Sequence, residues 1–330
     1  MADAGLNHQL GWVGTGRMGS ALALRLLAAG CRLSVYNRTA ARAEPLAIHG
    51  ATLVATAAGL GTADIVFVTV GGSQDLIDVV TGPGGLLDGP SAPAIVVDCS
   101  TVSAEASQHV RERLAANGAA LLAAPVMGNA KVARAGRLTL AVSGPEETFE
   151  QARPYLDLLG AGATYVGTGE SARIVKLCHN LLLGVVAQSL AEVVILAQQY
   201  GVRRHALLEC LNNSVLGSTF SRYKTPALVN LDFEPTFTAS LLRKDFDLGL
   251  AAAREAEVPL PVAALVHQLV QSLVGHGYGD MDFAALLRMQ ADSAGVTLVS
   301  EDVKVSDGLS PDGLFPDGGD GSASAPGRGD

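Results

Sequence analysis

Paired cysteines are absent from this sequence. The four cysteines lie far apart and include no C-x-x-C pair: Cys31, Cys99, Cys178 and Cys210. This spacing indicates neither a zinc site nor a disulfide framework, and the histidines are scattered without metal-ligand spacing. We therefore expect no bound metal and a reducing, cytoplasmic setting.

Clusters of lysine and arginine are also absent. The formal net charge is -9, and five of these nine excess negative charges lie in residues 301–330. The rest of the chain is mildly acidic and lacks the clustered basic residues that a phosphate backbone requires. Nucleic acid is therefore not expected as a partner.

The sequence shows no signal for targeting or membrane insertion. The first ten residues, "MADAGLNHQL", lack the basic start and apolar run of a signal peptide. The longest apolar segment, residues 181–197, is interrupted by Gln188, Ser189 and Glu192, which is typical of a buried helix. We expect a soluble protein that does not bind membranes.

The pattern of the chain indicates two domains of different class. Up to about residue 167, short β-rich runs such as "DIVFVTV" and "AIVVDCS" alternate with helical stretches rich in Ala and Leu. This alternation predicts βαβ units and a parallel sheet, and from about residue 170 only helical periods follow. We predict an α/β, Rossmann-type doubly wound domain at 1–168 and an all-α substrate and dimerisation domain at 169–295. Residues 296–330, rich in Gly, Asp, Ser and Pro, are predicted to be a disordered acidic tail.

The first predicted strand runs into a glycine-rich turn. "GTGRMGS" contains Gly14-x-Gly16-x-x-Gly19 and precedes the helical run "ALALRLLAAG". In a dinucleotide site the first glycine allows the tight turn, the second the approach of a pyrophosphate, and the third the packing of helix on strand. The free N–H groups of the helix would face the anion. We predict cofactor contacts from this turn, Arg17 and Met18 included.

The second predicted strand ends in "VYNRT", where an NAD enzyme would carry an acid for the ribose hydroxyls. Asn37 is neutral there, whereas Arg38 can bind a 2′-phosphate and Thr39 can donate a hydroxyl. The pattern favours NADP(H) as cofactor. The alternative is that Arg38 is only a surface residue.

A cation and an amide interrupt the apolar stretch that begins "RIVKLCHN". Lys176 and Asn180 are four residues apart, so a helix would present them on one face. His179 either faces the same cleft or merely packs or caps a polar contact at the domain junction. An isolated lysine in such a helix often covers apolar surface while its ammonium reaches water.

With the glycine turn, "YNRT", "DCST", "APVMG" and "GTGESARIVKLCHN" in this order, residues 9–292 resemble the β-hydroxyacid dehydrogenases. That family includes 3-hydroxyisobutyrate dehydrogenases and glyoxylate/succinic semialdehyde reductases. The resemblance implies an NADP-dependent oxidoreductase that interconverts a small 3-hydroxy or 2-hydroxy acid and its semialdehyde or oxo acid, acting as a reductase. It also implies a homodimer or homotetramer.

The same resemblance implies roles for individual residues. Lys176 matches the catalytic general acid/base, and Asn180 matches the asparagine that helps to hold the substrate. Lys244, in "RKDFDLGLA", matches a lysine that reaches the cofactor; the alternative is a surface ion pair with Asp245. Further matched positions near the cofactor are Val70, Gly71 and Thr101, and Ser100 matches a residue of the substrate pocket.

The "APVMG" loop departs from the family pattern. The family loop usually reads P-V-S-G-G, and its serine helps to bind the substrate carboxylate, whereas here the loop continues with Met127, Gly128 and Asn129. We expect these three residues to line the substrate pocket. Because Met127 has no hydroxyl to donate, a larger or less acidic substrate is expected.

Two other functions fit parts of this pattern. Imine reductases share the predicted architecture, and an apolar residue such as Met127 would suit them, but they usually lack the catalytic lysine. A non-catalytic NADP(H)-binding module is the other alternative. The presence of both Lys176 and Asn180 favours a carbonyl substrate.

Overall fold

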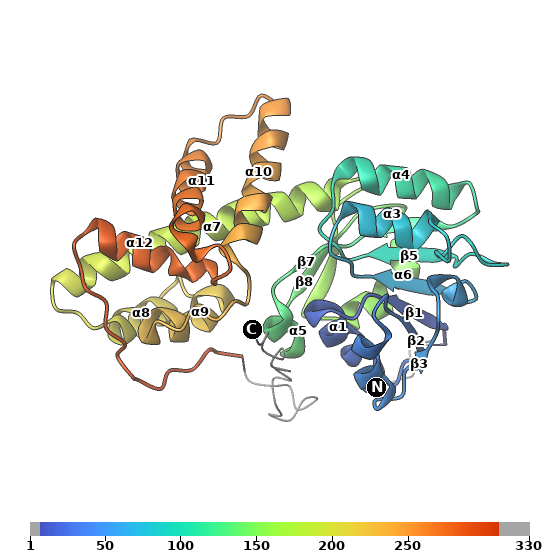
Figure 1. Ribbon diagram of the computed structural model, residues 1–330, viewed down its shortest axis with the longest axis horizontal. Helices are drawn as coiled ribbons and strands as arrows, with labels where there is room; N and C mark the ends of the chain where they lie inside the picture. The colour runs from blue at the N-terminus through green and yellow to red at the C-terminus, as the bar shows by residue number, and fades with distance from the viewer. Residues whose placement is uncertain (1–6, 310–330) are drawn as a thin grey trace, which may run out of the picture.

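The computed structural model describes residues 7–309 and has the α/β and all-α architecture expected from the sequence (Figure 1). The N-terminal domain is built on a six-stranded sheet in the order β3-β2-β1-β4-β5-β6, and every strand pair in it is parallel. Its strands are β1 (Leu10–Val13), β2 (Leu33–Tyr36), β3 (Thr52–Leu53), β4 (Ile65–Val68), β5 (Ile95–Asp98) and β6 (Ala120–Ala123). The helices between them are α1 (Arg17–Ala28), α2 (Glu44–Ala47), α3 (Ser73–Thr81) and α4 (Ala104–Ala115).

The central strands β1, β4 and β5 are buried over their whole length. A parallel sheet is covered by helices on both faces, which explains why these strands read as continuous apolar runs. The strand order reverses at β1, which lies between β2 and β4. In open α/β sheets, ligands bind beyond the carboxyl ends of the strands at such a reversal.

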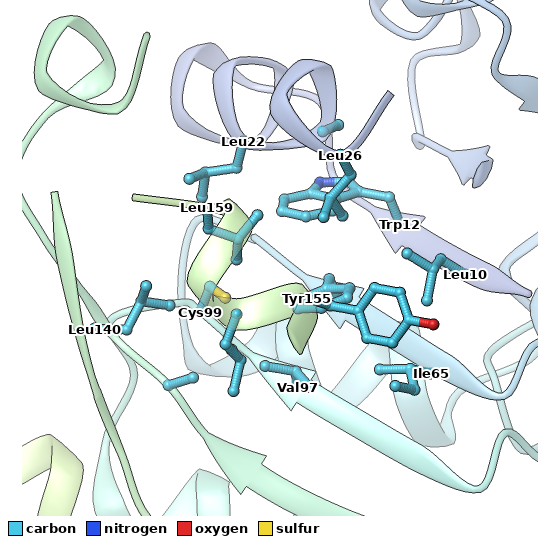
Figure 2. Close-up of a cluster of buried hydrophobic side chains, with 14 of the residues drawn as sticks. Leu10, Trp12, Leu22, Leu26, Ile65, Val97, Cys99, Leu140, Tyr155 and Leu159 are labelled. Carbon is cyan, nitrogen blue, oxygen red and sulfur yellow. The ribbon is translucent and has the colours of Figure 1, made fainter. Parts of the chain in front are cut away.

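The core on one face of this sheet is formed by large side chains from distant parts of the chain (Figure 2). Trp12 of β1 stacks on Phe67 of β4 with ring centroids 5.3 Å apart. Tyr155, from α6 (Glu146–Leu158), is almost fully buried against the same cluster. This packing fixes α1, and with it the glycine turn, against the sheet.

A second sheet of three strands follows: β7 (Val126–Met127), β8 (Thr139–Val142) and β9 (Gly162–Tyr165), with the short helix α5 (Ala130–Arg134) after β7. β7 is antiparallel to β8, and β8 is parallel to β9. The sequence run "ALLAAPV" reads as one strand but contains the whole of β6 and the first residue of β7. Proline breaks a strand because it cannot donate to the ladder, and Pro125 lies between the two.

The C-terminal domain is helical and is organised around the 29-residue helix α7 (Ser171–Gln199) (Figure 1). α7 extends from the sheet domain through the helical domain and packs against α8, α10, α11 and α12. The other helices are α8 (Arg204–Asn213), α9 (Thr219–Asn230), α10 (Ala239–Glu255), α11 (Pro261–Leu273) and α12 (Leu286–Ser293).

A buried charge network anchors the start of α7 to the sheet. The Arg173 guanidinium donates to Asp98 at the end of β5 (2.7 Å), to Ser107 (2.8 Å) and to Glu170 (2.8 Å). It also donates to the Ser100 carbonyl at 3.2 Å. Because Asp98 is completely buried and Arg173 nearly so, each needs the other's charge.

Residues 296–309 do not match the prediction of a disordered tail that begins at 296. They lie along the helical domain, where Arg204 donates to the Val299 carbonyl and Asn230 donates to the Val303 carbonyl. Further on, Asp307 forms an ion pair with Lys131 of α5 at 3.1 Å. The remaining part of the predicted tail, 310–330, lies outside the described residues.

α7 is the one helix among residues 7–309 that is long and apolar enough to cross a membrane by length and composition alone. Polar side chains at Asn180 and Gln188 are buried along it, which is typical of the core helix of a helical domain. Its outer face is apolar and exposed, at Leu182, Leu196 and neighbouring positions. A subunit contact would cover such a face, and self-association stays a prediction.

We expect Asp98→Asn to lower the free energy of unfolding by about 3 kcal/mol, because it leaves Arg173 buried beside a neutral amide. Thermal unfolding monitored by calorimetry would measure the effect. The matched control is Glu150→Gln, which breaks the half-exposed Glu150–Arg153 pair (3.0 Å) and is expected to cost less than about 1 kcal/mol. Equal melting temperatures for the two variants would contradict the anchoring role of Asp98.

Candidate active site

The glycine turn has the geometry of a dinucleotide-binding turn. Gly14 has φ +89°, and a Cβ there would overlap the Thr69 carbonyl, whereas a Cβ on Gly19 would overlap the Gly14 carbonyl. Both positions therefore need glycine for backbone reasons. Gly16 differs, since nothing lies within 4 Å of the position of its Cβ. Its glycine leaves open space in front of the turn.

A hollow of about 490 Å³ lies in front of this turn, lined by Thr15, Gly16, Arg17, Ser20 and Arg42. α1 begins at its edge without a side-chain cap, so the N–H groups of its first turn are open to an anion. The buried Thr15 hydroxyl has no hydrogen-bond partner among the described residues. These features fit the pyrophosphate of a dinucleotide. Met18, by contrast, packs against the sheet core.

The loop after β2 lies beside the glycine turn. The Asn37 side chain accepts a hydrogen bond from the Thr15 N–H and donates one to the Thr39 carbonyl, both at 2.8 Å. Arg38 is 84% exposed and pairs with Asp75 at 3.0 Å. Arg42 was not predicted from the sequence, and only the fold shows that the short turn after β2 brings it to the hollow.

The loops after β4 and β5 lie at the same edge of the sheet. The Val70 N–H donates to the Ser100 hydroxyl at 2.9 Å, and the Ser100 N–H donates to Asp98 at 2.9 Å. Ser100 is buried and does not line the interdomain cavity, although a pocket position was predicted for it. Gly71 and Thr101 are the next residues of these two loops.

A cavity of about 270 Å³ lies between the loop after β7 and the helices α7 and α9. It brings together the predicted residues of both domains. From the loop it receives Met127, Gly128 and Asn129, and from α7 it receives Lys176, His179 and Asn180. The cavity therefore contains every residue predicted to contact substrate except Ser100.

Lys176 is held by a backbone acceptor at the wall of this cavity. Its ammonium donates to the Val126 carbonyl at 2.8 Å. Burial lowers the pKa of Lys176 from its usual value to about 8, although the negative charge of Asp245 opposes that shift and the positive charge of Lys244 adds to it. At neutral pH such a lysine is close to its titration point, which suits a residue that gives and takes a proton.

Asn180 is fixed at both ends of its amide. Its Nδ2 donates to the Asp245 carboxylate at 2.5 Å, so its Oδ1 faces His179 Nδ1 at 2.8 Å. Because Oδ1 can only accept, the hydrogen of the neutral imidazole lies on Nδ1. Burial lowers the pKa of His179 below its usual value. The hydrogen bond to Asn180 opposes that shift, and the positive charge of Lys176 adds to it. His179 therefore faces the cavity and also makes the polar contact that was its alternative.

Asp245 was not assigned a role from the sequence, although it lies in the recognised segment "RKDFDLGLA". Burial raises the pKa of its carboxyl, while Lys244, Lys176 and the hydrogen bond from Asn180 oppose the shift. Lys244, predicted to reach the cofactor, lies with its Nζ 3.8 Å from Asp245 and is 44% exposed. It does not line the interdomain cavity.

Aromatic side chains from the helical domain form the other wall. Phe283 is stacked with Phe220 (ring centroids 6.1 Å apart) and meets Phe237 edge to face (5.8 Å). Beneath them the buried Lys224 pairs with Asp282 at 2.6 Å. None of these residues was predicted, because their spacing in the sequence is that of ordinary core positions.

Within residues 7–309 no group of three His, Cys, Asp or Glu side chains is placed to hold a metal ion. A glycine turn at the strand-order reversal, together with a cavity between the two domains that is lined by a buried lysine, is the arrangement of a dinucleotide-dependent oxidoreductase.

Comparison with known proteins places the chain within that class. A family profile described as the NAD binding domain of 6-phosphogluconate dehydrogenase matches residues 9–167. A second, described as NAD-binding of NADP-dependent 3-hydroxyisobutyrate dehydrogenase, matches residues 169–290. Glyoxylate/succinic semialdehyde reductase 2 of Arabidopsis thaliana is 30% identical over 279 residues, which cover 84% of this chain and 78% of that protein. The chain belongs to the β-hydroxyacid dehydrogenase family and is an NAD(P)-dependent oxidoreductase that acts on hydroxyl groups.

Solved structures share the architecture. Psf3 in complex with NADP⁺ and 2-OPP is 25% identical, with a TM-score of 0.75, over 85% of this chain and 99% of that one. An imine reductase from Myxococcus stipitatus in complex with NADP⁺ is 23% identical, with a TM-score of 0.55, over 85% of this chain and 99% of that one. The second likeness shows the fold alone.

We expect Gly16→Ala to leave the melting temperature of the cofactor-free protein unchanged, because its φ of -67° suits alanine and the added methyl meets no protein atom. The methyl projects into the hollow, so dinucleotide binding should weaken at least tenfold in a fluorescence titration with NADPH. Gly14→Ala is the contrasting variant and should lose stability itself. Normal NADPH affinity in Gly16→Ala would contradict this placement of the pyrophosphate.

Proposed function

We propose that this protein is an NADP(H)-dependent reductase that converts a small semialdehyde or oxo acid into its hydroxy acid, with Lys176 as general acid. The observation that carries the proposal is the placement of Lys176. Its ammonium, with a pKa of about 8, lies in an interdomain cavity beside the carboxyl edge of a dinucleotide-binding sheet.

The bound nicotinamide supplies or accepts the hydride. In the reductive direction negative charge develops on the carbonyl oxygen, and Lys176 donates the proton that neutralises it. In the oxidative direction neutral Lys176 takes the hydroxyl proton. General acid–base catalysis of this kind typically contributes about 10²–10⁴-fold to the rate.

Asn180 holds this part of the cavity in one arrangement. One N–H of its amide goes to Asp245, which leaves the other for a substrate oxygen. The same contact keeps Asp245 behind the amide, where its charge supports the protonated form of Lys176. We therefore assign substrate positioning to Asn180, the role that the family resemblance implies for it.

The preference for NADP(H) rests on charge near the expected ribose. The loop after β2 offers Arg38 and Thr39 and no acid of its own, and Arg42 lines the adjoining hollow. A 2′-phosphate suits these cations, whereas an NAD site usually carries a carboxylate. Arg38 would exchange its exposed ion pair with Asp75 for the phosphate, at little cost in stability.

Imine reduction is a second candidate, supported by the apolar Met127 in the substrate loop and by the shared fold. A lysine at its titration point argues for carbonyl chemistry, because a carbonyl oxygen needs a proton in the step that reduces it. A non-catalytic NADP(H)-binding module would not require Lys176 and Asn180 to converge on one cavity.

We expect NADPH-dependent turnover of at least one of glyoxylate, succinic semialdehyde and tartronate semialdehyde, with slower turnover when NADH replaces NADPH. Lys176→Ala should lower kcat by about 10²–10⁴-fold while NADPH still binds normally. NADPH oxidation followed at 340 nm would measure both. Turnover of a cyclic imine alone would support imine reduction, and NADPH binding without turnover of any substrate would support the binding module.

The pH dependence should follow Lys176. Because reduction needs the protonated lysine, kcat/KM for reduction should fall as pH rises through about 8, and kcat/KM for oxidation should rise through the same range. Asp245→Asn removes the charge that raises the pKa of Lys176, so both midpoints should move to lower pH. The two profiles in buffers of equal ionic strength would show this. A midpoint that stays in place or moves up would contradict the coupling.

A further inference from the structure

The cavity carries a cation that the proposed reaction does not use. Arg137 lines it, on the segment between α5 and β8. Its side chain is exposed, like that of Arg134. Within residues 7–309 the Arg137 guanidinium has no ion pair and no hydrogen bond to a side chain or carbonyl, in contrast to its neighbour Lys131, which pairs with Asp307. No aspartate or glutamate is among the residues that line the cavity. An anion entering it would therefore meet positive charge and no repulsion.

A second donor without a partner lies on the other arm of the same hairpin. Asn129 is only 6% exposed, and its Nδ2 makes no hydrogen bond with any described residue. Its Oδ1 is already used, since it accepts from the Val132 N–H at 3.0 Å and caps α5. A buried amide N–H without an acceptor is costly, so a ligand in the cavity that Asn129 lines would gain from bringing an acceptor to it.

The hairpin register places the two donors at one end of the cavity. Met127 of β7 is paired with Thr139 of β8, and Val126 with Leu140. Continued by two residues on each strand, this antiparallel pairing sets Asn129 opposite Arg137. The two strands remain close at the intervening pair, because a Cβ on Gly128 would lie 3.1 Å from the Leu138 Cβ.

Lys176 lies at the opposite end of the hairpin. Its ammonium binds the Val126 carbonyl, and Leu140, the partner of Val126, is three residues beyond Arg137. At the rise of an antiparallel strand, three residues span about 10 Å. An anion bound by Arg137 is thus well separated from the carbon that reacts beside Lys176.

We infer that Arg137 and Asn129 form a subsite for an anionic group at the end of the substrate remote from the reacting carbonyl. The inference rests on the proposed reductase function and narrows its substrate to oxo compounds with a terminal carboxylate or similar anion. Guanidinium binds carboxylate through two parallel hydrogen bonds, and the Asn129 amide adds a third donor. This subsite would supply the anion recognition that Met127, without a hydroxyl, does not provide near Lys176.

The test compares two aldehydes that differ only in the remote anion, succinic semialdehyde and butanal, both reduced with NADPH. In the wild-type protein kcat/KM should be higher for succinic semialdehyde. Arg137→Gln should lower the ratio of the two kcat/KM values about 10- to 100-fold, mainly through KM, and Arg137→Lys should restore part of it. Asn129→Asp, which keeps the helix cap and loses the donor, should lower the ratio as well.

The matched control is Arg134→Gln, which removes the same charge from an exposed position of α5 that does not line the cavity. This variant should keep the wild-type ratio. An unchanged ratio in Arg137→Gln, or an equal fall in Arg134→Gln, would overturn the inference, since the second result shows only a long-range effect of charge.

Equilibrium binding separates this inference from the reductase proposal. Calorimetric titration of succinate into the protein with bound NADP⁺ needs no turnover. Arg137→Gln should weaken the affinity for succinate about 10- to 100-fold. If no aldehyde is reduced but succinate binding depends on Arg137, the reductase proposal fails and the subsite stands. If aldehydes are reduced in a Lys176-dependent way but neither readout depends on Arg137, the subsite fails and the reductase proposal stands.

Discussion

The ion pair between Arg173 and Asp98 is the contact on which the geometry of the site depends. Asp98 ends the central strand β5, and Arg173 lies in the first turn of α7, so the pair fixes the helix to the carboxyl edge of the sheet. Lys176 follows Arg173 by three residues and Asn180 by seven, and both project from a helix whose start cannot move independently of β5. The same guanidinium binds the Ser100 carbonyl, which ties in the loop whose serine accepts from Val70. The buried guanidinium of Arg173 thus fixes Lys176 relative to the carboxyl edge of the sheet, where the cofactor is expected to bind.

The parts of this structure that follow local rules could be predicted from the sequence. The strand and helix alternation, the glycine turn and the convergence of Lys176 with Asn180 each depend on a short stretch with a clear period or spacing. The turn is the sharpest case, because the backbone at Gly14 and Gly19 tolerates no side chain. The change of domain class near residue 170 was visible for the same reason, since α7 begins at Ser171.

The parts of the structure that depend on long-range packing could not be predicted from the sequence. Pro125 splits one apparent strand into two sheets, and Asp307 meets α5 through a segment whose composition predicts disorder. Arg42 and Arg137 look like ordinary surface arginines in the sequence, and only the fold shows that each lines a hollow. Asp245 was within a recognised motif, yet its bond to Asn180 joins residues 65 positions apart. Such pairings leave no period in the sequence.

The position of Asp245 resolves a conflict in the charge requirements of the cavity. Lys176 benefits from a negative charge nearby, because burial lowers its pKa and the charge of Asp245 opposes that shift, which favours the protonated form. A carboxylate that faced the cavity would repel an anionic substrate. Asp245 lies behind the Asn180 amide, and from there its charge raises the pKa of Lys176. The cavity itself is lined only by neutral and positively charged residues. The neutral His179 completes this arrangement, since it holds the amide in place and adds no charge of its own.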